Sequence, residues 1–235
     1  MRNSFNNFIV NESNKEAFEF ANKVAKQETV KANPLFISGP SGCGKSHLLD
    51  GIWHHYVCTD NGKHPEWISS FALTERFKNF NQGKNQFADK FNELDLLLFD
   101  DIDTVDDKCN GELLSQVIDE LIKRGKQICV ASTKPLNELS PALKDIFSKG
   151  KCVKVSLPTK DEQIDFYKQL SKREGISLHG EEPYDYLCEK QKDYRTIKAE
   201  FVRLKYNMVL ENCETASLGV GAIKRYLENK WKLLY

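Results

Sequence analysis

The chain has 235 residues, of which 40% are hydrophobic and 29% are charged, a composition that fits a folded globular protein and argues against disorder. Lys and Arg together number 34, as do Asp and Glu, so no overall positive field draws the protein to nucleic acid. No apolar stretch approaches the length of a membrane span and the amino terminus has no apolar signal core, which argues against export and indicates a cytoplasmic location.

From about residue 35, short apolar segments alternate with longer amphipathic ones. Strands are predicted at residues 35–38, 67–71, 94–99, 128–132 and 152–155. Amphipathic helices are predicted between them at residues 47–57 and 112–124. Such alternation predicts an α/β fold, in which a parallel sheet carries helices on both faces.

After Pro158 we expect no further strand. The segment Thr159-Lys-Asp-Glu162 has the pattern of a capping box and opens a helix that ends at Gly175. Further helices are predicted at residues 184–190, 194–211 and 221–233. We therefore expect an α/β domain over residues 1–157 and a small helical domain over residues 158–235.

The first strand runs directly into a complete phosphate-loop pattern, G-x-x-x-x-G-K-[ST], from Gly39 to Ser46. Glycines let backbone N–H groups curl around an anion where a side chain would clash. Lys45 would place its charge on the β- and γ-phosphates, and we expect it to face solvent without a ligand. The Ser46 hydroxyl can ligate Mg²⁺. The residues predicted to contact nucleotide here are Gly39, Pro40, Ser41, Gly42, Cys43, Gly44, Lys45, Ser46 and His47.

Two carboxylates, Asp100 and Asp101, follow an apolar run that suits a central strand buried on both faces. The tip of such a strand brings them beside the phosphate loop. Asp100 is predicted to hold Mg²⁺, directly or through water, and Asp101 to polarise an attacking water. An Asp-Asp pair alone is more often a turn or a helix cap, but together with the phosphate loop it indicates a nucleoside triphosphate site.

A phosphate-loop core followed by a helical lid resembles the AAA+ ATPases, and the motifs are similar to those of the bacterial DnaA replication initiators. Residues 4–14 resemble the initiators' TFDNFVVGxSN opening, residues 94–102 resemble VDVLLIDDI, and residues 126–132 resemble KQIVISS. The resemblance covers nearly the whole chain and implies ATP or ADP with Mg²⁺ as ligands. In that family the opening lies against the adenine, which here implies roles for Phe8, Ile9 and Asn14.

The resemblance also assigns two sensors of the γ-phosphate. Thr133 falls at the first sensor position, where the family usually has Asp, and its hydroxyl can hydrogen-bond phosphate or water. The alternative is a threonine that only ends a strand. Arg195 matches the lid's sensor arginine, which would link nucleotide occupancy to lid closure. The alternative is an exposed helix arginine.

Two departures from the initiators affect the expected function. Ile146 stands where the family carries an arginine finger, and the nearby Lys144 and Lys149 lack a guanidinium fork, so we do not expect activation between subunits. The expected layout, an AAA+ module with no duplex-reading module, resembles that of the initiator-like regulator Hda, although the chain has nothing like Hda's clamp-binding peptide.

The segment between Phe71 and Glu93, which includes Arg76 to Phe91, has the length of the extra helix pair that marks initiators and helicase loaders. In the family this region lines a channel for single-stranded DNA, which implies phosphate contacts for Lys84 and Lys90. Lys108 matches a family lysine after the paired aspartates, and the resemblance implies the same role for it. The alternative is that the phenylalanines of this segment are buried faces of amphipathic helices and the lysines are a solvated rim.

The leading hypothesis is therefore an ATP-binding, DnaA-like AAA+ protein that acts in DNA replication initiation or its regulation, with weak intrinsic ATPase activity. One alternative is a nucleotide-gated adaptor that joins an initiator, a helicase or a sliding clamp and hydrolyses little ATP. A helicase loader, a third possibility, would share the core and the helical insertion. The partners expected are those replication proteins, single-stranded DNA and further copies of the chain in a nucleotide-dependent assembly.

Overall fold

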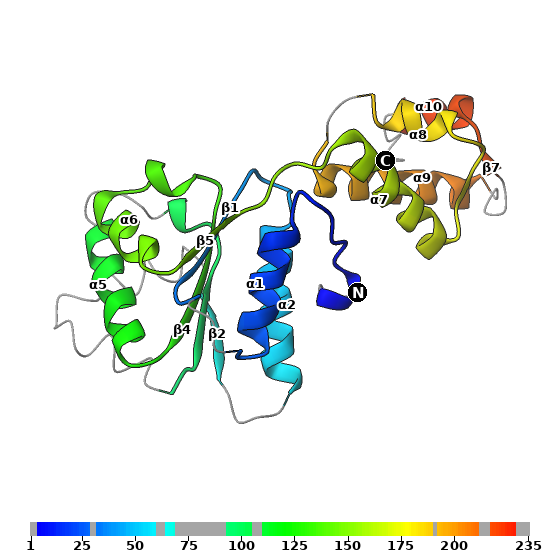
Figure 1. Ribbon diagram of the computed structural model, residues 1–235. Coiled ribbons are helices and arrows are strands. Elements are labelled where there is room, and N and C mark those ends of the chain that lie inside the picture. The colour runs from blue at the N-terminus through cyan, green and yellow to red at the C-terminus, as the bar shows by residue number, and fades with distance from the viewer. Residues whose placement is uncertain are drawn as a thin grey trace, which may run out of the picture. The chain divides into compact units, whose positions relative to one another are not determined.

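The computed structural model describes residues 4–28, 32–59, 64–68, 93–104, 110–189, 192–211 and 217–228. The chain divides into two compact units, residues 1–156 and residues 157–235 (Figure 1). The sequence-based boundary after residue 157 differs from this division by one residue. Within the described part, no helix is both long and apolar enough to cross a membrane.

The first unit is built on a five-stranded parallel sheet with the order β2-β3-β4-β1-β5. Its strands are β1 (Leu35–Ser38), β2 (Pro65–Ile68), β3 (Leu96–Phe99), β4 (Gln127–Ser132) and β5 (Lys151–Lys154). This arrangement confirms the predicted α/β class. β2 begins two residues earlier than predicted, and residues 69–71 of that prediction lie outside the described part of the chain.

Helices cover both faces of the sheet (Figure 1). Helices α1 (Lys15–Ala25) and α2 (Lys45–Cys58) pack on one face, and α5 (Asn110–Lys123) and α6 (Pro141–Ser148) pack on the other. Side chains alternate between the two faces along each strand. Leu35 and Ile37 accordingly belong to the core cluster on the side of α1 and α2. Phe36, between them, belongs to the core cluster on the side of α5 and α6.

Among the described residues of this unit, two helices were not predicted, although the sequence carries their signals. α1 buries Ala17, Ala21 and Val24, which recur at the spacing of one helical face. α6 begins at Pro141 directly after Ser140, a common start for a helix because proline needs no hydrogen-bond acceptor there. The described residues of this unit also contain three short 3-10 helices: η1 (Phe5–Asn7), η2 (Ile102–Thr104) and η3 (Leu136–Glu138).

The second unit contains helices α7 (Lys160–Glu174), α8 (Glu182–Leu187), α9 (Tyr194–Leu210) and α10 (Val220–Glu228). The capping box is confirmed, because the Glu162 amide donates to Thr159 Oγ1 and the Thr159 amide donates to the Glu162 carboxylate. Gly175 ends α7 with a positive φ of 72°.

The expectation that strands stop at Pro158 is wrong. β6 (Ser177–Leu178) and β7 (Ser217–Leu218) form a small parallel pair within the second unit. Each strand has only two residues, which is too short for any periodic pattern to appear in the sequence. Leu178 and Leu218 are both buried in the core of this unit.

Candidate functional site

The phosphate loop connects the end of β1 to the start of α2. The Gly39 amide donates to the Ser132 carbonyl at 3.1 Å, which ties the loop to the end of β4. A Cβ atom at Gly39 would lie 2.2 Å from the Val155 carbonyl oxygen. The glycine is therefore required by the close approach of the loop to the chain just after β5. Gly44 has a φ of 108°, which is accessible to glycine and strained for other residues.

Lys45 does not face solvent, contrary to our expectation. The residue is only 5% exposed, and its Nζ donates to the carbonyl oxygens of Gly39 (2.8 Å) and Pro40 (2.9 Å). A buried ammonium group needs hydrogen-bond partners, and the loop turns its own carbonyl groups toward this one. The cation is thus held within the phosphate loop.

The remaining loop residues differ in accessibility. Pro40 and Ser41 are exposed, and Ser46 is half-buried in the first turn of α2. Cys43 is fully buried and packs in the core cluster beneath the loop. Its thiol is therefore part of the core, and only the backbone of Cys43 is available to a phosphate.

The opening segment of the chain packs against the start of α2. The Phe8 ring meets the His47 ring edge-on at 5.1 Å, and a Cβ atom at Gly44 would lie 3.3 Å from it. His47 Nε2 lies 2.8 Å from Asn7 Oδ1, which anchors the segment to the helix. The structure thus brings Phe8 and His47 together beside the phosphate loop.

Asn14 has a role within the opening segment itself. It is 1% exposed; its Nδ2 donates to the Ile9 carbonyl (3.0 Å) and its Oδ1 accepts from the Asn11 amide (3.0 Å). Both ends of the amide are therefore used to fold residues 9–14. Contacts of Phe8, Ile9 and Asn14 with adenine remain a prediction.

The two predicted carboxylates lie at the same edge of the sheet as the loop. Ser38 lies opposite Ser132 in the β1–β4 pair, and Phe99 lies opposite Val130 in the β3–β4 pair. Asp101, two residues beyond Phe99, therefore reaches the level of Ser132. Asp101 has a φ of 52°, and its amide donates to Asp100 Oδ1 at 3.1 Å. A sharp turn thus follows β3 and keeps both carboxylates at the sheet edge.

The donor set at this edge fits Mg²⁺. Mg²⁺ prefers hard oxygen ligands and keeps several waters, so one or two protein oxygens suffice to hold it. Ser46 supplies a hydroxyl at the start of α2, and Asp100 supplies a carboxylate after β3. When bound, the cation would neutralise charge on the phosphates.

Asp103, in η2, is a third carboxylate that sequence reasoning missed. Its Oδ1 accepts from Ser132 Oγ (2.9 Å) and the Thr133 amide (2.8 Å), and its Oδ2 accepts from Thr133 Oγ1 (2.6 Å). Burial opposes ionisation of this carboxyl, but the hydrogen bonds from Thr133 and Ser132 outweigh it and lower the pKa of Asp103. The only sequence signal is a further Asp two residues after Asp101, and the β3–β4 pairing is needed to place it beside Thr133.

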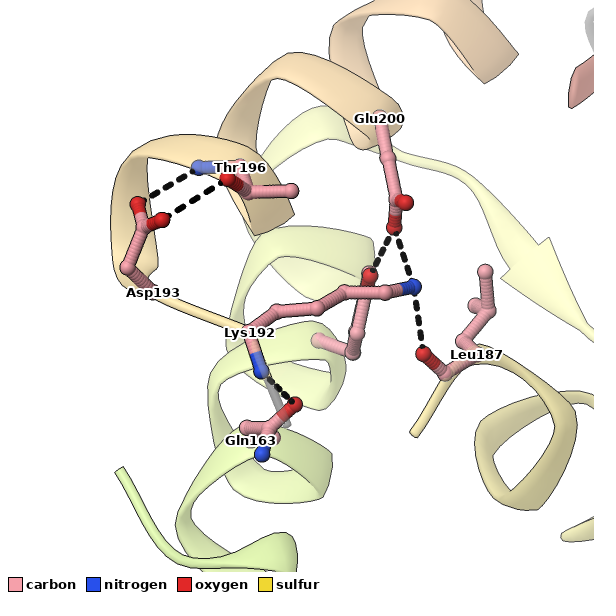
Figure 2. Close-up of polar contacts among 7 residues, drawn as sticks. Gln163, Leu187, Lys192, Asp193, Thr196 and Glu200 are labelled. Atoms are coloured by element: carbon pink, nitrogen blue, oxygen red, sulfur yellow. Dashed lines mark hydrogen bonds and ion pairs between the residues drawn. The ribbon is translucent and has the colours of Figure 1, made fainter. Parts of the chain in front are cut away.

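In the second unit, Arg195 lies exposed in the first turn of α9. The Asp193 carboxylate caps this helix by accepting from the Thr196 amide (2.9 Å) and Thr196 Oγ1 (2.8 Å) (Figure 2). Burial works against the charge of Asp193, yet these hydrogen bonds lower the pKa of the carboxyl below its usual value. The cap therefore fixes the backbone that carries Arg195.

The start of α9 is also held by a network of three side chains, two of which are labelled in Figure 2. Lys192 Nζ donates to Glu200 Oε2 (2.8 Å) and to the Leu187 carbonyl (2.7 Å), and the Tyr167 hydroxyl donates to the same Glu200 oxygen (2.6 Å). Burial and the Glu200 carboxylate raise the pKa of Tyr167. The network joins α7, α8 and α9 of this unit.

The side chain at the family's arginine-finger position, Ile146, points into the core. Ile146 is 4% exposed and belongs to the core cluster between α5, α6 and the sheet. Of the two nearby lysines, Lys149 forms an ion pair with Asp145 (2.7 Å) and Lys144 is exposed. The predicted DNA contacts Lys84, Lys90 and Lys108 lie outside the described residues.

Known structures define the fold class to which this architecture belongs. Domain III of the replication initiation protein DnaA from Thermotoga maritima matches with a TM-score of 0.81 at 24% identity, covering 96% of this chain and 95% of that one. A mutant RuvB of the same organism matches with a TM-score of 0.70 at 17% identity, covering 97% and 73%. Likeness at these identities shows the shared fold.

Sequence comparison identifies the family within this class. Residues 1–154 match the family model "Bacterial DnaA ATPAse domain", so the chain belongs to the family of bacterial DnaA ATPase domains. The chromosomal replication initiator protein DnaA of Onion yellows phytoplasma is 31% identical over 71% of this chain and 34% of its own length. That of Thermoanaerobacter sp. is 28% identical over 97% of this chain and 53% of its own length. The chain spans about half or less of these relatives.

Proposed function

We propose that the protein binds ATP and ADP at the phosphate loop, with Mg²⁺ held by Ser46 and Asp100, and acts in the initiation of DNA replication or its regulation. The observation that carries this proposal is the Lys45 ammonium group, held inside the loop by two loop carbonyl groups. The structure of AMPPCP-bound DnaA from Aquifex aeolicus matches with a TM-score of 0.74 at 26% identity, covering 91% of this chain and 67% of that one. Membership of the same family supports a nucleotide site here.

Each site residue then has a defined task. A phosphate oxygen is a stronger acceptor for the Lys45 ammonium group than a neutral carbonyl. In hydrolysis, the water oxygen would bond to the γ-phosphorus and the bond to the β–γ bridging oxygen would break, leaving ADP and phosphate. Asp101 would polarise this water. Arg195, on the second unit as a lid, would report on the γ-phosphate.

Hydrolysis by the isolated protein is expected to be slow, on the order of 10³-fold or more below that of finger-assisted enzymes. The reason is Ile146, whose buried side chain cannot reach the nucleotide of a neighbouring subunit. Phosphate release at saturating ATP measures this rate, and Asp101→Asn should remove what activity there is. Asp145→Asn, an exposed change on α6, is the matched control. Rapid turnover by the monomer would show that another residue replaces the finger.

The buried Ile146 also favours a second function, a nucleotide-gated adaptor or loader that binds an initiator, a helicase or a sliding clamp and hydrolyses little. Such a cytoplasmic protein would bind different partners in its ATP-bound and ADP-bound forms. It would do so either as a single subunit or as an assembly of several copies. Recovery of a replication protein with one nucleotide but not the other, on immobilised protein, tests this role. Equal recovery with both nucleotides contradicts gating.

Single-stranded DNA binding separates the two functions. One solved structure is that of a replication initiator DnaA bound to AMPPCP and single-stranded DNA. Here we expect weak binding through Lys84, Lys90 and Lys108, steeply reduced by salt and strengthened by ATP, because aligned subunits would combine weak contacts. Fluorescence anisotropy of a labelled oligonucleotide measures it, with the alanine triple variant of these lysines.

A second triple variant, in which Lys15, Lys26 and Lys198 become alanine, removes the same charge from exposed positions elsewhere. It should bind as the parent does if the contacts are local. The absence of binding at low salt with either nucleotide would support the adaptor.

A further inference from the structure

The hydrogen bonds around Asp103 determine what the Thr133 hydroxyl can do. Asp103 is ionised near neutral pH, since its pKa lies below the ordinary value, and an ionised carboxylate only accepts hydrogen bonds. In the 2.6 Å contact between Thr133 Oγ1 and Asp103 Oδ2, the hydroxyl is therefore the donor. A hydroxyl has a single hydrogen, so the Thr133 hydroxyl can only accept hydrogen bonds from any other group.

The direction of this hydrogen bond determines which group the Thr133 hydroxyl can contact in a nucleotide site. Terminal phosphate oxygens of ATP at neutral pH are acceptors, so they cannot pair with a hydroxyl whose hydrogen is already used. A water molecule can, because it has hydrogens to donate. We propose that Asp103 is a positioning residue that turns the Thr133 hydroxyl into a hydrogen-bond acceptor for the water that attacks the γ-phosphate. This inference rests on the proposed nucleotide site.

Two further contacts show that the arrangement is built into the sheet edge. Asp103 Oδ1 accepts from the Thr133 amide, which leaves Oδ2 to face the hydroxyl. Ser132 Oγ lies 2.9 Å from the same Oδ1 and 2.8 Å from the Lys134 carbonyl oxygen, and these two acceptors share its single hydrogen. The Ser132 carbonyl accepts from the Gly39 amide of the phosphate loop. Asp103 thus connects the turn after β3, the end of β4 and the loop, and it acts on the water through Thr133.

The substitution Asp103→Asn should reverse the direction of the hydrogen bond between residue 103 and Thr133 Oγ1. Its oxygen must stay toward the Thr133 amide, which can only donate, so its NH₂ group would face Thr133 Oγ1 as a donor. The hydroxyl would then accept from the amide, and its hydrogen would be free for a phosphate oxygen. We expect hydrolysis to fall about tenfold, while affinity for AMPPCP relative to ADP rises about three- to tenfold.

A double-mutant cycle with Thr133→Val, which keeps the shape and removes the hydroxyl, tests this with AMPPCP and ADP binding and with single-turnover hydrolysis. Thr133→Val alone should leave the AMPPCP-to-ADP affinity ratio unchanged and slow hydrolysis about as much as Asp103→Asn. In the Asp103→Asn background it should return the raised ratio to the parent value. Glu138→Gln, an exposed carboxylate on η3, controls for loss of charge.

The outcomes separate this inference from the proposed function. A lower AMPPCP-to-ADP ratio in Thr133→Val alone would show that the hydroxyl donates to phosphate and would overturn the inference. Equal loss of both affinities with a lower melting temperature in Asp103→Asn would reduce Asp103 to a structural role and would also overturn it. A parent protein that binds neither nucleotide would instead overturn the proposed function itself.

Discussion

Replacing Lys45 with alanine is expected to lower the affinity for ATP by about 10²- to 10⁴-fold and the affinity for ADP by about 10- to 10²-fold. The ammonium group would make charge-assisted hydrogen bonds to the β- and γ-phosphates of ATP but only to the β-phosphate of ADP, each worth ~1.5–3 kcal/mol. The same substitution removes the donor to the Gly39 and Pro40 carbonyl groups. We therefore also expect the first unit to lose about 1–3 kcal/mol of stability without any nucleotide.

Two measurements keep these effects apart. Calorimetric titration with ATP and ADP gives the affinities, and thermal unfolding in the absence of nucleotide gives the stability. Lys45→Met retains most of the buried stem and should bind nucleotide as poorly as alanine while unfolding closer to the parent. Lys144→Ala, an exposed change on α6, should affect neither quantity. Nucleotide binding as tight as the parent's would refute the phosphate-loop assignment.

Gly39→Ala is expected to destabilise the first unit by about 3 kcal/mol or more, and so to lower the melting temperature by roughly 6–12 °C. The added Cβ would lie 2.2 Å from the Val155 carbonyl oxygen, a backbone atom that cannot move aside alone. The loop would have to shift away from β5, which also breaks the hydrogen bond from Gly39 to Ser132. Nucleotide affinity should fall with it.

A matched control comes from Gly125, where a Cβ atom would meet nothing within 4 Å although φ is +75°. Gly125→Ala should therefore cost only the strain of the left-handed backbone, about 1 kcal/mol. Thermal unfolding of both variants compares the two effects. If Gly39→Ala is no more destabilised than Gly125→Ala, the contact with Val155 does not limit the loop.

The sheet was predictable because its strands are apolar segments bounded by polar residues. Residues 35–38 were predicted with the bounds that β1 has, and the run before Asp100 contains β3. The β6–β7 pair was not predictable, since its two strands have two residues each and lie about 40 residues apart. Helix α1 could have been found from its buried alanine spacing.

The candidate site, like the fold, was predictable only in part. Local patterns located Lys45 and the paired aspartates, because the residues that define each motif are consecutive in the sequence. The burial of Lys45 was missed, since its acceptors become visible only once the loop is folded. Asp103 was missed because its partners, Ser132 and Thr133, lie at the end of another strand and directly after it.

The burial of Ile146 limits which substitutions can arise at this position. Ile146 packs in the core cluster that includes Phe36 and Phe147, whose rings lie 5.2 Å apart. An arginine there would bury a charge without a partner and cost several kcal/mol, a large part of the roughly 5–15 kcal/mol that typically holds a domain folded. An arginine finger at this position would need its neighbours to be rebuilt first. A single Ile146→Arg substitution would be removed by selection for folding before it could be tested for activity.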